Sequence, residues 1–432
     1  MQVDRVYHLY SFSQLLRFKI FLRLVSFNVI VKNMRKIYSL SCRVLGNTIT
    51  NKSVKVLFGD IFVGGENEKE LVVRMKKLDQ QGFFSISDYA LEALSKEDNN
   101  LILSNINEFK KSIDSSKSVN SNNMVAMKIS SLISLDRLRD LNSIQLYFSF
   151  LEENSSFDDF LKNLEAYQVQ HMIPKEYCNK EKFTEMKVKT GELFSGLTNK
   201  SNMFKFNIFE YISNNKDKSK LSKIINLDVK VGNSGDSTVL NSLERIEKLL
   251  SDTKQIFDYG KQNNITLVID AEQTYLQTAI EYLFNVLAFE NNQKNDCYAI
   301  NTFQMYLTTS SKKLKQSIIF NKDNNLNLGL KIVRGAYILE ETRIANQQGY
   351  ANPIYHSYSD TNNNYNEGVD YLIESCTEKD RIIFATHNKE SIKLLYEKLR
   401  KSGKISYKNI CSAQLLGMGE ETSFLSKDTY VS

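Results

Sequence analysis

Polar side chains follow short apolar segments at several places in the chain, most of them in its second half. One such place is the stretch "KIVRGAY" (331–337), where two cations flank an apolar pair and a glycine comes next. The residues of this kind are Lys128, Asp270 with Glu272, Gln304, Lys331 with Arg334, Thr386 with His387 and Asn388, and Gln414. A set so rich in cations suits an anionic substrate or a phosphate-bearing cofactor.

Each of these residues also has a purely structural interpretation. An Asp at the end of a strand, such as Asp270, commonly caps the next helix, and a histidine such as His387 is more often a core residue than a catalyst. Arg334 and Gly335 can be a solvated arginine and a turn glycine. Lys128 is harder to explain in this way, because a lysine inside an apolar strand is rarely buried without an anionic partner.

The elements that would position these residues alternate regularly from residue 266 onward. The stretch "TLVIDAEQ" (266–273) predicts a buried strand, and Leu276, Ala279, Ile280 and Leu283 then recur at helical spacing. Such alternation predicts an α/β fold with a parallel sheet. A TIM-like (β/α)8 barrel is favoured over an open sheet, because no GxGxxG phosphate loop follows any strand. In a barrel the residues at the strand ends meet at one face.

The chain divides by composition into a basic N-terminal segment and a barrel domain. Residues 1–55 hold ten lysines and arginines and a single acid. An acid-poor segment that contains serines is typical of organellar presequences, but it can equally be a helical arm. We assign residues 56–432 to the barrel domain, with a flexible Ser/Asn-rich linker at 110–123 and a divergent helical region at 135–262.

Composition excludes several classes of protein. The chain has 432 residues, 42% of them hydrophobic and 25% charged, which is typical of a globular protein. The net charge of +6 is spread without long runs of like charge, so we expect no nucleic-acid partner. The five cysteines form no CxxC pair and the four histidines lack metal-ligand spacing. We therefore expect a reducing compartment and no bound metal.

Several motifs carry a resemblance to a known family. In order along the chain they are "LVIDAEQTYLQ", "NTFQMYL", "KIVRGAYILEE", "FATHN" and "QLLGMGEE", and "FVGGENEKE" with "ISDYALE" precedes them. Together they resemble the flavin-dependent proline dehydrogenases over residues 57–424, with a poorly matching middle at 135–262. The resemblance implies a TIM-like barrel that binds FAD.

The resemblance also implies roles for residues near the substrate. Asp270 and Lys331 would be the catalytic residues, with Asp270 in the proline pocket and Lys331 beside the flavin N5 atom. Lys128 would approach the substrate carboxylate. Tyr337 and Leu415 would touch the substrate.

The same resemblance implies an FAD site built from the remaining strand-end residues. Gln304 would bond the edge of the flavin ring, and Thr386 and His387 would hold the phosphate or ribose portion. The residues that would contact the cofactor are Gln304, Lys331, Arg334, Gly335, Ala336, Thr386 and His387. The stretch "KIVRGAY" would then be a barrel strand whose cations and backbone face the flavin.

The reaction implied by the resemblance is the oxidation of L-proline to Δ1-pyrroline-5-carboxylate, the first step of proline catabolism. Electrons would pass to a membrane quinone. The expected location is the mitochondrion, on the matrix side of the inner membrane and in peripheral contact with it. Oxidation of hydroxyproline is an alternative that the motifs do not separate.

The C-terminal end departs from the family pattern. Family members carry a helix of the type "YLxRRAxEN" after the last strand, and its Arg pair grips the proline carboxylate. This chain instead ends in "SFLSKDTYVS" and has no Arg-Arg pair. We therefore expect a barrel that is incomplete at its C-terminal helix. A truncated, non-catalytic flavin-binding barrel is a second alternative.

Overall fold

The computed structural model describes residues 11–89, 91, 93–166, 169–173, 178–194, 207–209, 212 and 239–430. The chain divides into two compact units. The larger unit comprises Phe84–Phe384 with Ser406–Cys411, and the smaller unit comprises Met1–Phe83, Ala385–Ile405 and Ser412–Ser432.

Seven strands form one sheet, and they follow one another in the order in which they occur in the chain. They are β1 (Ile86–Asp88), β2 (Met124–Met127), β3 (Thr266–Ile269), β4 (Ala299–Gln304), β5 (Gly329–Val333), β6 (Arg381–Ala385) and β7 (Ile410–Ala413). The first six strands pair in parallel, with Thr302 of β4 opposite Lys331 of β5. Every residue of β3 and β4 is buried, as is typical of parallel strands covered by helices.

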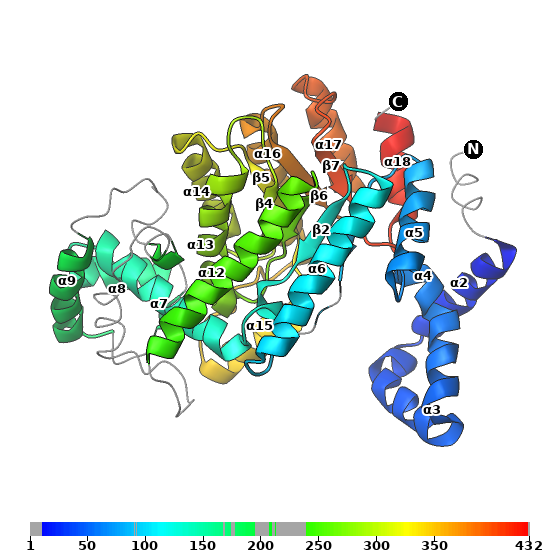
Figure 1. Ribbon diagram of the computed structural model, residues 1–432, viewed down its shortest axis with the longest axis horizontal. Helices are drawn as coiled ribbons and strands as arrows, with labels where there is room; N and C mark the ends of the chain where they lie inside the picture. Colours follow the sequence, from blue (N-terminus) through cyan, green and yellow to red (C-terminus); the bar gives the residue numbers. More distant parts are fainter. Residues whose placement is uncertain are drawn as a thin grey trace. The chain divides into compact units, whose positions relative to one another are not determined.

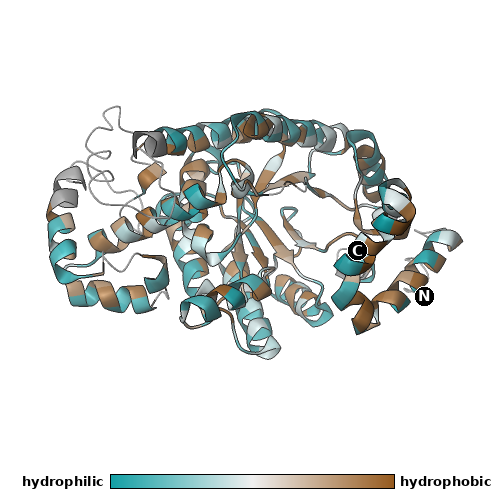
Figure 2. Cartoon of the chain, turned by 90° about the horizontal axis from the view of Figure 1, so that it is seen from below, coloured by the Kyte–Doolittle hydropathy of each residue, from teal (hydrophilic) through white to brown (hydrophobic). Residues whose placement is uncertain are grey.

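The predicted α/β fold of the barrel type is confirmed. The sheet is curled and helices flank it (Figure 2). The described residues form a sheet of seven strands, whereas a (β/α)8 barrel has eight. A helix, α18 (Glu420–Tyr430), follows the last strand, and it contains no Arg-Arg pair.

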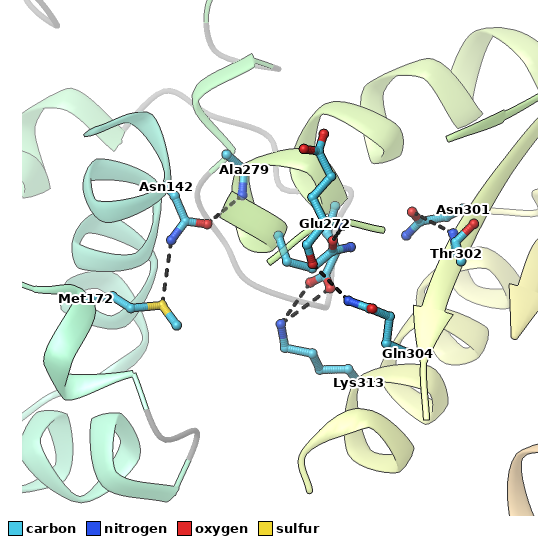
Figure 3. Close-up of polar contacts among 10 residues, drawn as sticks. Asn142, Met172, Glu272, Ala279, Asn301, Thr302, Gln304 and Lys313 are labelled. Carbon is cyan, nitrogen blue, oxygen red and sulfur yellow. Dashed lines mark hydrogen bonds and ion pairs between the residues drawn. The ribbon is translucent and has the colours of Figure 1, made fainter. Parts of the chain in front are cut away.

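The helices of the larger unit lie outside its strands (Figure 1). They are α6 (Asn99–Val119), α7 (Leu135–Glu153), α8 (Phe157–Ala166), α9 (Lys180–Phe194), α12 (Val239–Gln262), α13 (Thr274–Asn291), α14 (Ser310–Asp323), α15 (Ile338–Gln348) and α16 (Tyr358–Ser375). The two most buried are α7 and α13, which pack against each other. Asn142 Oδ1 of α7 accepts a hydrogen bond from the Ala279 N–H of α13 at 3.1 Å (Figure 3).

The flexible linker predicted at 110–123 is wrong, because α6 extends through most of it. The buried face of α6 consists of Ile102, Asn105, Ile106, Phe109, Ser112, Ile113, Ser115 and Ser116. Its apolar members recur at helical spacing, and the small serines between them let the helix pack closely against β2. The described part of the region predicted as helical at 135–262 is mostly helical, whereas 213–238 lies outside the described residues.

The smaller unit consists mainly of helices. They are α2 (Phe12–Val25), α3 (Asn28–Val54), α4 (Asp60–Phe62), α5 (Glu68–Gln80), α17 (Lys389–Lys401) and α18. The rings of Phe18 and Phe21 pack against Phe62, with centroids 6.3 and 5.3 Å apart. Helices α2 and α3 make up most of the described part of the segment 1–55. The role of this segment in import stays a prediction. No described helix has a stretch long and apolar enough to span a bilayer.

The chain turns sharply after β5, at Gly335. Its φ is +144°, and a Cβ atom there would lie 2.4 Å from the ring of Tyr306. Gly349, at the C-terminal end of α15, also has a positive φ, +72°, but a Cβ atom there would meet nothing within 4 Å. Position 335 therefore requires glycine both for its backbone conformation and for its contact with Tyr306.

A half-buried histidine lies outside the set of strand-end residues. His171 belongs to the 3-10 turn η3 (Gln170–Met172), and its ring stacks on Tyr350 with centroids 3.5 Å apart. Burial lowers the pKa of His171 to about 4, because the charged imidazolium loses its hydration there.

Gly335→Ala should lower the free energy of unfolding by roughly 3 kcal/mol or more, because backbone strain adds to overlap with the Tyr306 ring. Gly349→Ala is the matched control and should cost only about 1 kcal/mol. Thermal unfolding of the two variants measures the difference. Equal costs would show that the Tyr306 ring moves aside freely.

His171 should make folding stability depend on pH. The unfolded chain binds this proton below about pH 6.5, whereas the folded protein binds it only near its pKa of about 4, so stability should fall as the pH is lowered between these values. His171→Phe keeps a ring on Tyr350, and its melting temperature should fall less between about pH 7 and about pH 4.5. A variant H171F that melts with the pH dependence of the unmodified protein would contradict the burial effect.

Candidate functional site

The candidate site is built around an ion pair between Lys331 and Asp270. Lys331 lies in β5, Asp270 directly follows β3, and Lys331 Nζ is 2.6 Å from Asp270 Oδ1. Because β4 lies between these strands, the pair bridges across it. The side chains are only 11% and 20% exposed, so water screens their attraction weakly. The two residues predicted to be catalytic are therefore in direct contact.

A second cation and a second carboxylate lie within electrostatic reach of this pair. Lys128 directly follows β2, and Asp88 ends β1. Desolvation raises the pKa of Asp88 most, and Asp270 raises it further, whereas Lys128 and Lys331 lower it. Sequence reasoning missed Asp88, because the strand that it ends has only three residues. The larger unit thus gathers two lysines and two carboxylates from four strands, β1, β2, β3 and β5, or from the residue directly after the strand.

Glu272 ties the ends of β2 and β3 together. It is 3% exposed, and its Oε1 accepts a hydrogen bond from the Ser130 N–H at 2.9 Å. Burial raises the pKa of Glu272, while the Ser130 contacts and Lys128 oppose the increase. The sequence indicated Glu272 as a strand-end residue, but its partner could not be predicted.

Gln304, at the end of β4, connects the segments that follow β3 and β5. Its Nε2 donates to the Glu272 carbonyl oxygen at 2.8 Å (Figure 3), and its Oε1 accepts from the Ala336 N–H at 3.3 Å. The side chain is buried. An amide has a second N–H and a second lone pair, so these two bonds leave capacity for a ligand. Its contact with a flavin stays a prediction.

The residues after β5 point toward different neighbours. Arg334 Nε donates to Asn362 Oδ1 at 2.8 Å, and the guanidinium lies over the Tyr365 ring at 4.3 Å. Burial lowers the pKa of Arg334. Burial also raises the pKa of Tyr337, and nearby carboxylates, Glu272 first among them, raise it further. Tyr337 therefore lies in the electrostatic environment of the Asp270 end of β3, whereas Arg334 lies against α16.

Three predicted site residues belong to the smaller unit. Thr386 is buried, its N–H donates to the Ala413 carbonyl at 3.0 Å, and its Oγ1 accepts from the Asn388 N–H at 3.1 Å. His387 lies beside Gly419, where a Cβ atom would be 2.8 Å from its Nδ1. Leu415 is 65% exposed. These residues share one unit, and their predicted contacts with FAD or substrate stay predictions.

A small hollow lies between α13, α14 and η3. Its walls include Gln304, His171 and the ion pair of Glu281 with Lys313 at 3.2 Å. Neither Asp270 nor Lys331 lines it, so Gln304 is the candidate-site residue that it shares with the strand ends. In the part of the chain that the structure describes, no cluster of His, Cys, Asp and Glu could hold a metal ion.

Several curated proteins are similar to this chain. "Proline dehydrogenase 2, mitochondrial" from Arabidopsis thaliana is 33% identical over 189 residues, which is 41% of this chain and 38% of that protein. "Proline dehydrogenase 1, mitochondrial" from Dictyostelium discoideum is 26% identical over 416 residues, which is 93% of this chain and 62% of that protein. The chain therefore spans less than two thirds of the length of either relative.

Two solved structures share the fold of this chain, and a sequence model of a protein family matches most of its length. Proline utilization A (PutA) from Bdellovibrio bacteriovorus, inactivated by N-propargylglycine, matches with a TM-score of 0.57 at 16% identity, over 96% of this chain and 34% of that chain. A PutA mutant from Bradyrhizobium japonicum matches with a TM-score of 0.54 at 14% identity, over 90% of this chain and 30% of that chain. At these identities the likeness concerns the fold. The model of the family described as "Proline dehydrogenase" matches residues 71–430, so the chain belongs to the proline dehydrogenase family.

Proposed function

We propose that this protein is an enzyme that oxidises L-proline to Δ1-pyrroline-5-carboxylate, the first step of proline catabolism, with FAD as its cofactor. The observation that carries the proposal is the Asp270–Lys331 ion pair, which joins the end of β3 to β5 across β4, in a chain whose family match spans most of its length. A charged, half-enclosed pair of this kind suits a small zwitterion, because proline presents both a carboxylate and an amine.

The polar groups around the pair can bind the two ends of such a zwitterion. Lys128 supplies a cation for the substrate carboxylate, and Asp270 supplies a carboxylate for its amine. Asp88 adds a second negative group within electrostatic reach of Asp270. Tyr337 and Leu415 complete the proposed substrate contacts. In this arrangement the side chains orient the ring, which is the main contribution that an enzyme makes to a cofactor reaction.

The chemistry of the strand-end side chains fits FAD. Lys331 and Arg334 are cations suited to the charge of a flavin or of phosphates, and Gln304 retains hydrogen-bonding capacity beside them. Gly335 and Ala336 expose backbone at the same strand end. Thr386 and His387 are proposed to hold the phosphate or ribose portion. When bound, FAD supplies the hydride acceptor of the reaction.

We place the protein in mitochondria, on the matrix side of the inner membrane, with a membrane quinone as electron acceptor. The names of the relatives from Arabidopsis thaliana and Dictyostelium discoideum support the compartment. Helices α2 and α3 support peripheral contact with the membrane, because they combine cations with exposed apolar side chains such as Phe12 and Val29, which are 82% and 73% exposed. Segment 1–55 then serves as presequence or arm before a barrel domain at 56–432.

A second candidate substrate is hydroxyproline. "Hydroxyproline dehydrogenase" from Xenopus laevis is 28% identical over 197 residues, which is 44% of this chain and 40% of that protein. The two substrates differ by one hydroxyl group, which the charged groups described above do not distinguish.

Flavin binding and dye reduction test the proposal. The purified full chain should show flavin absorbance and should release FAD on denaturation. It should then reduce an artificial electron acceptor when proline is added, and faster than with hydroxyproline at equal concentration. A protein that binds no flavin after reconstitution, or that reduces the dye with neither substrate, would rule the function out.

Asp270→Ala should lower kcat/KM for proline by about 100-fold or more, because the substrate amine loses a charge-assisted contact and Lys331 loses its partner. Flavin content should stay the same. The matched control is Asp296→Ala, which removes a carboxylate that pairs with Lys261 at 2.9 Å but is more exposed than Asp270, at 42% against 20%. Steady-state kinetics measures kcat/KM for both variants. Equal values would contradict the assignment of Asp270 to the substrate site.

A further inference from the structure

The carboxylate of Glu341 in α15 is fully buried, with an exposed fraction of 0%. Within the part of the chain that the structure describes, it forms no ion pair with a lysine or arginine. Its Oε1 instead accepts a hydrogen bond from the Thr274 N–H at 2.7 Å, and its Oε2 accepts one from Thr274 Oγ1 at 2.7 Å. Both oxygens therefore depend on a single residue of another helix.

Thr274 is the first residue of α13, so Glu341 acts at the N-terminus of that helix. The residue before it, Gln273, makes no side-chain capping bond, and the first turn of α13 contains no acid. A helix N-terminus has unsatisfied N–H groups and a partial positive charge, and both are stabilised by a carboxylate. Glu341 thus supplies from α15 the cap that the local sequence of α13 lacks.

The position of this cap relates it to the candidate site. Thr274 comes four positions after Asp270, and Glu341 comes five positions after Ala336. The cap therefore joins the segment after β3 to the segment after β5. Gln304 also connects these two segments, and the Asp270–Lys331 pair connects the first of them to β5 itself. Since β4 separates the strands, such side-chain contacts take the place of backbone hydrogen bonds between them.

We propose that Glu341 is a positioning residue, which caps α13 and thereby holds the Asp270 carboxylate in register with Lys331. Its kinetic consequence rests on the proposed function, whereas its structural coupling to Asp270 does not.

The burial of Glu341 supports a directed role. An apolar side chain of similar volume would fill the space without the cost of burying a carboxylate. That burial raises the pKa of Glu341, and the contacts with Thr274 oppose the increase. A carboxylate that is costly to bury is explained if its two bonds fix the start of α13 relative to α15.

The test uses Glu341→Met, which keeps the length of the side chain and removes both acceptors. In the full chain loaded with FAD, KM for proline should rise about tenfold while kcat changes less than about twofold, because Asp270 is displaced from the substrate amine. Glu341→Gln keeps one acceptor and should restore KM to within about threefold. The control is Glu340→Met, which removes the neighbouring carboxylate, partly exposed and paired with Arg343, and should leave KM unchanged.

A double-mutant cycle separates positioning from simple stabilisation of α13. If Glu341 holds Asp270 in place, then Asp270→Asn should lower the melting temperature clearly less in the Glu341→Met background than alone, by about 2 °C or more. Additive shifts would overturn the proposal, since a local cap acts independently of Asp270.

Thr274→Val removes only the hydroxyl group that donates to Glu341. This variant replaces Glu341→Met in the cycle if Glu341→Met does not fold. Non-additive shifts with Asp270→Asn would again support the tie, and additive shifts would again overturn it. If the unmodified chain binds no flavin or oxidises no proline, the proposed function fails. The thermal cycle then decides the role of Glu341 on its own.

Discussion

The ion pair of Asp270 with Lys331 is the contact on which the arrangement of the strand ends depends. Two opposite charges that are mostly removed from water destabilise a fold unless they form an ion pair with each other. Their strands are two spacings apart, roughly 10 Å, and only a long side chain can cover that distance. Lys331 lies opposite Thr302 of β4, and Ile269, the residue before Asp270, lies opposite Asn301, the residue before Thr302. The register therefore brings Lys331 close to the end of β3, and its side chain covers the remaining distance to Asp270.

The strand-end residues could be predicted because the local sequence shows where a buried strand ends. An apolar run followed by a charge, as in "TLVID" before Asp270, marks the place where buried backbone reaches solvent, whatever its neighbours are. The parallel order of the strands followed from the same alternation. Composition was a poorer guide, as α6 shows: its serines indicated a linker, yet small side chains are what a helix needs to lie close to a strand.

The partners of these residues could not be predicted, because partners depend on which loops become neighbours. Gln304 reads as one amide at a strand end, and nothing in its local sequence indicates a bridge between Glu272 and Ala336. Glu341 reads as an exposed acid in the first turn of a helix, next to Glu340. Asp88 was missed for another reason, since β1 has only three residues and gives too short a pattern to interpret.

The two N-terminal helices differ from the rest of the fold in how little of their surface is covered. No residue of α2 is buried, and Thr50 alone is buried in α3. Opening such helices costs little free energy, because few apolar contacts are lost and their backbone hydrogen bonds exchange readily with water. This end of the chain can therefore unfold locally while the sheet stays folded.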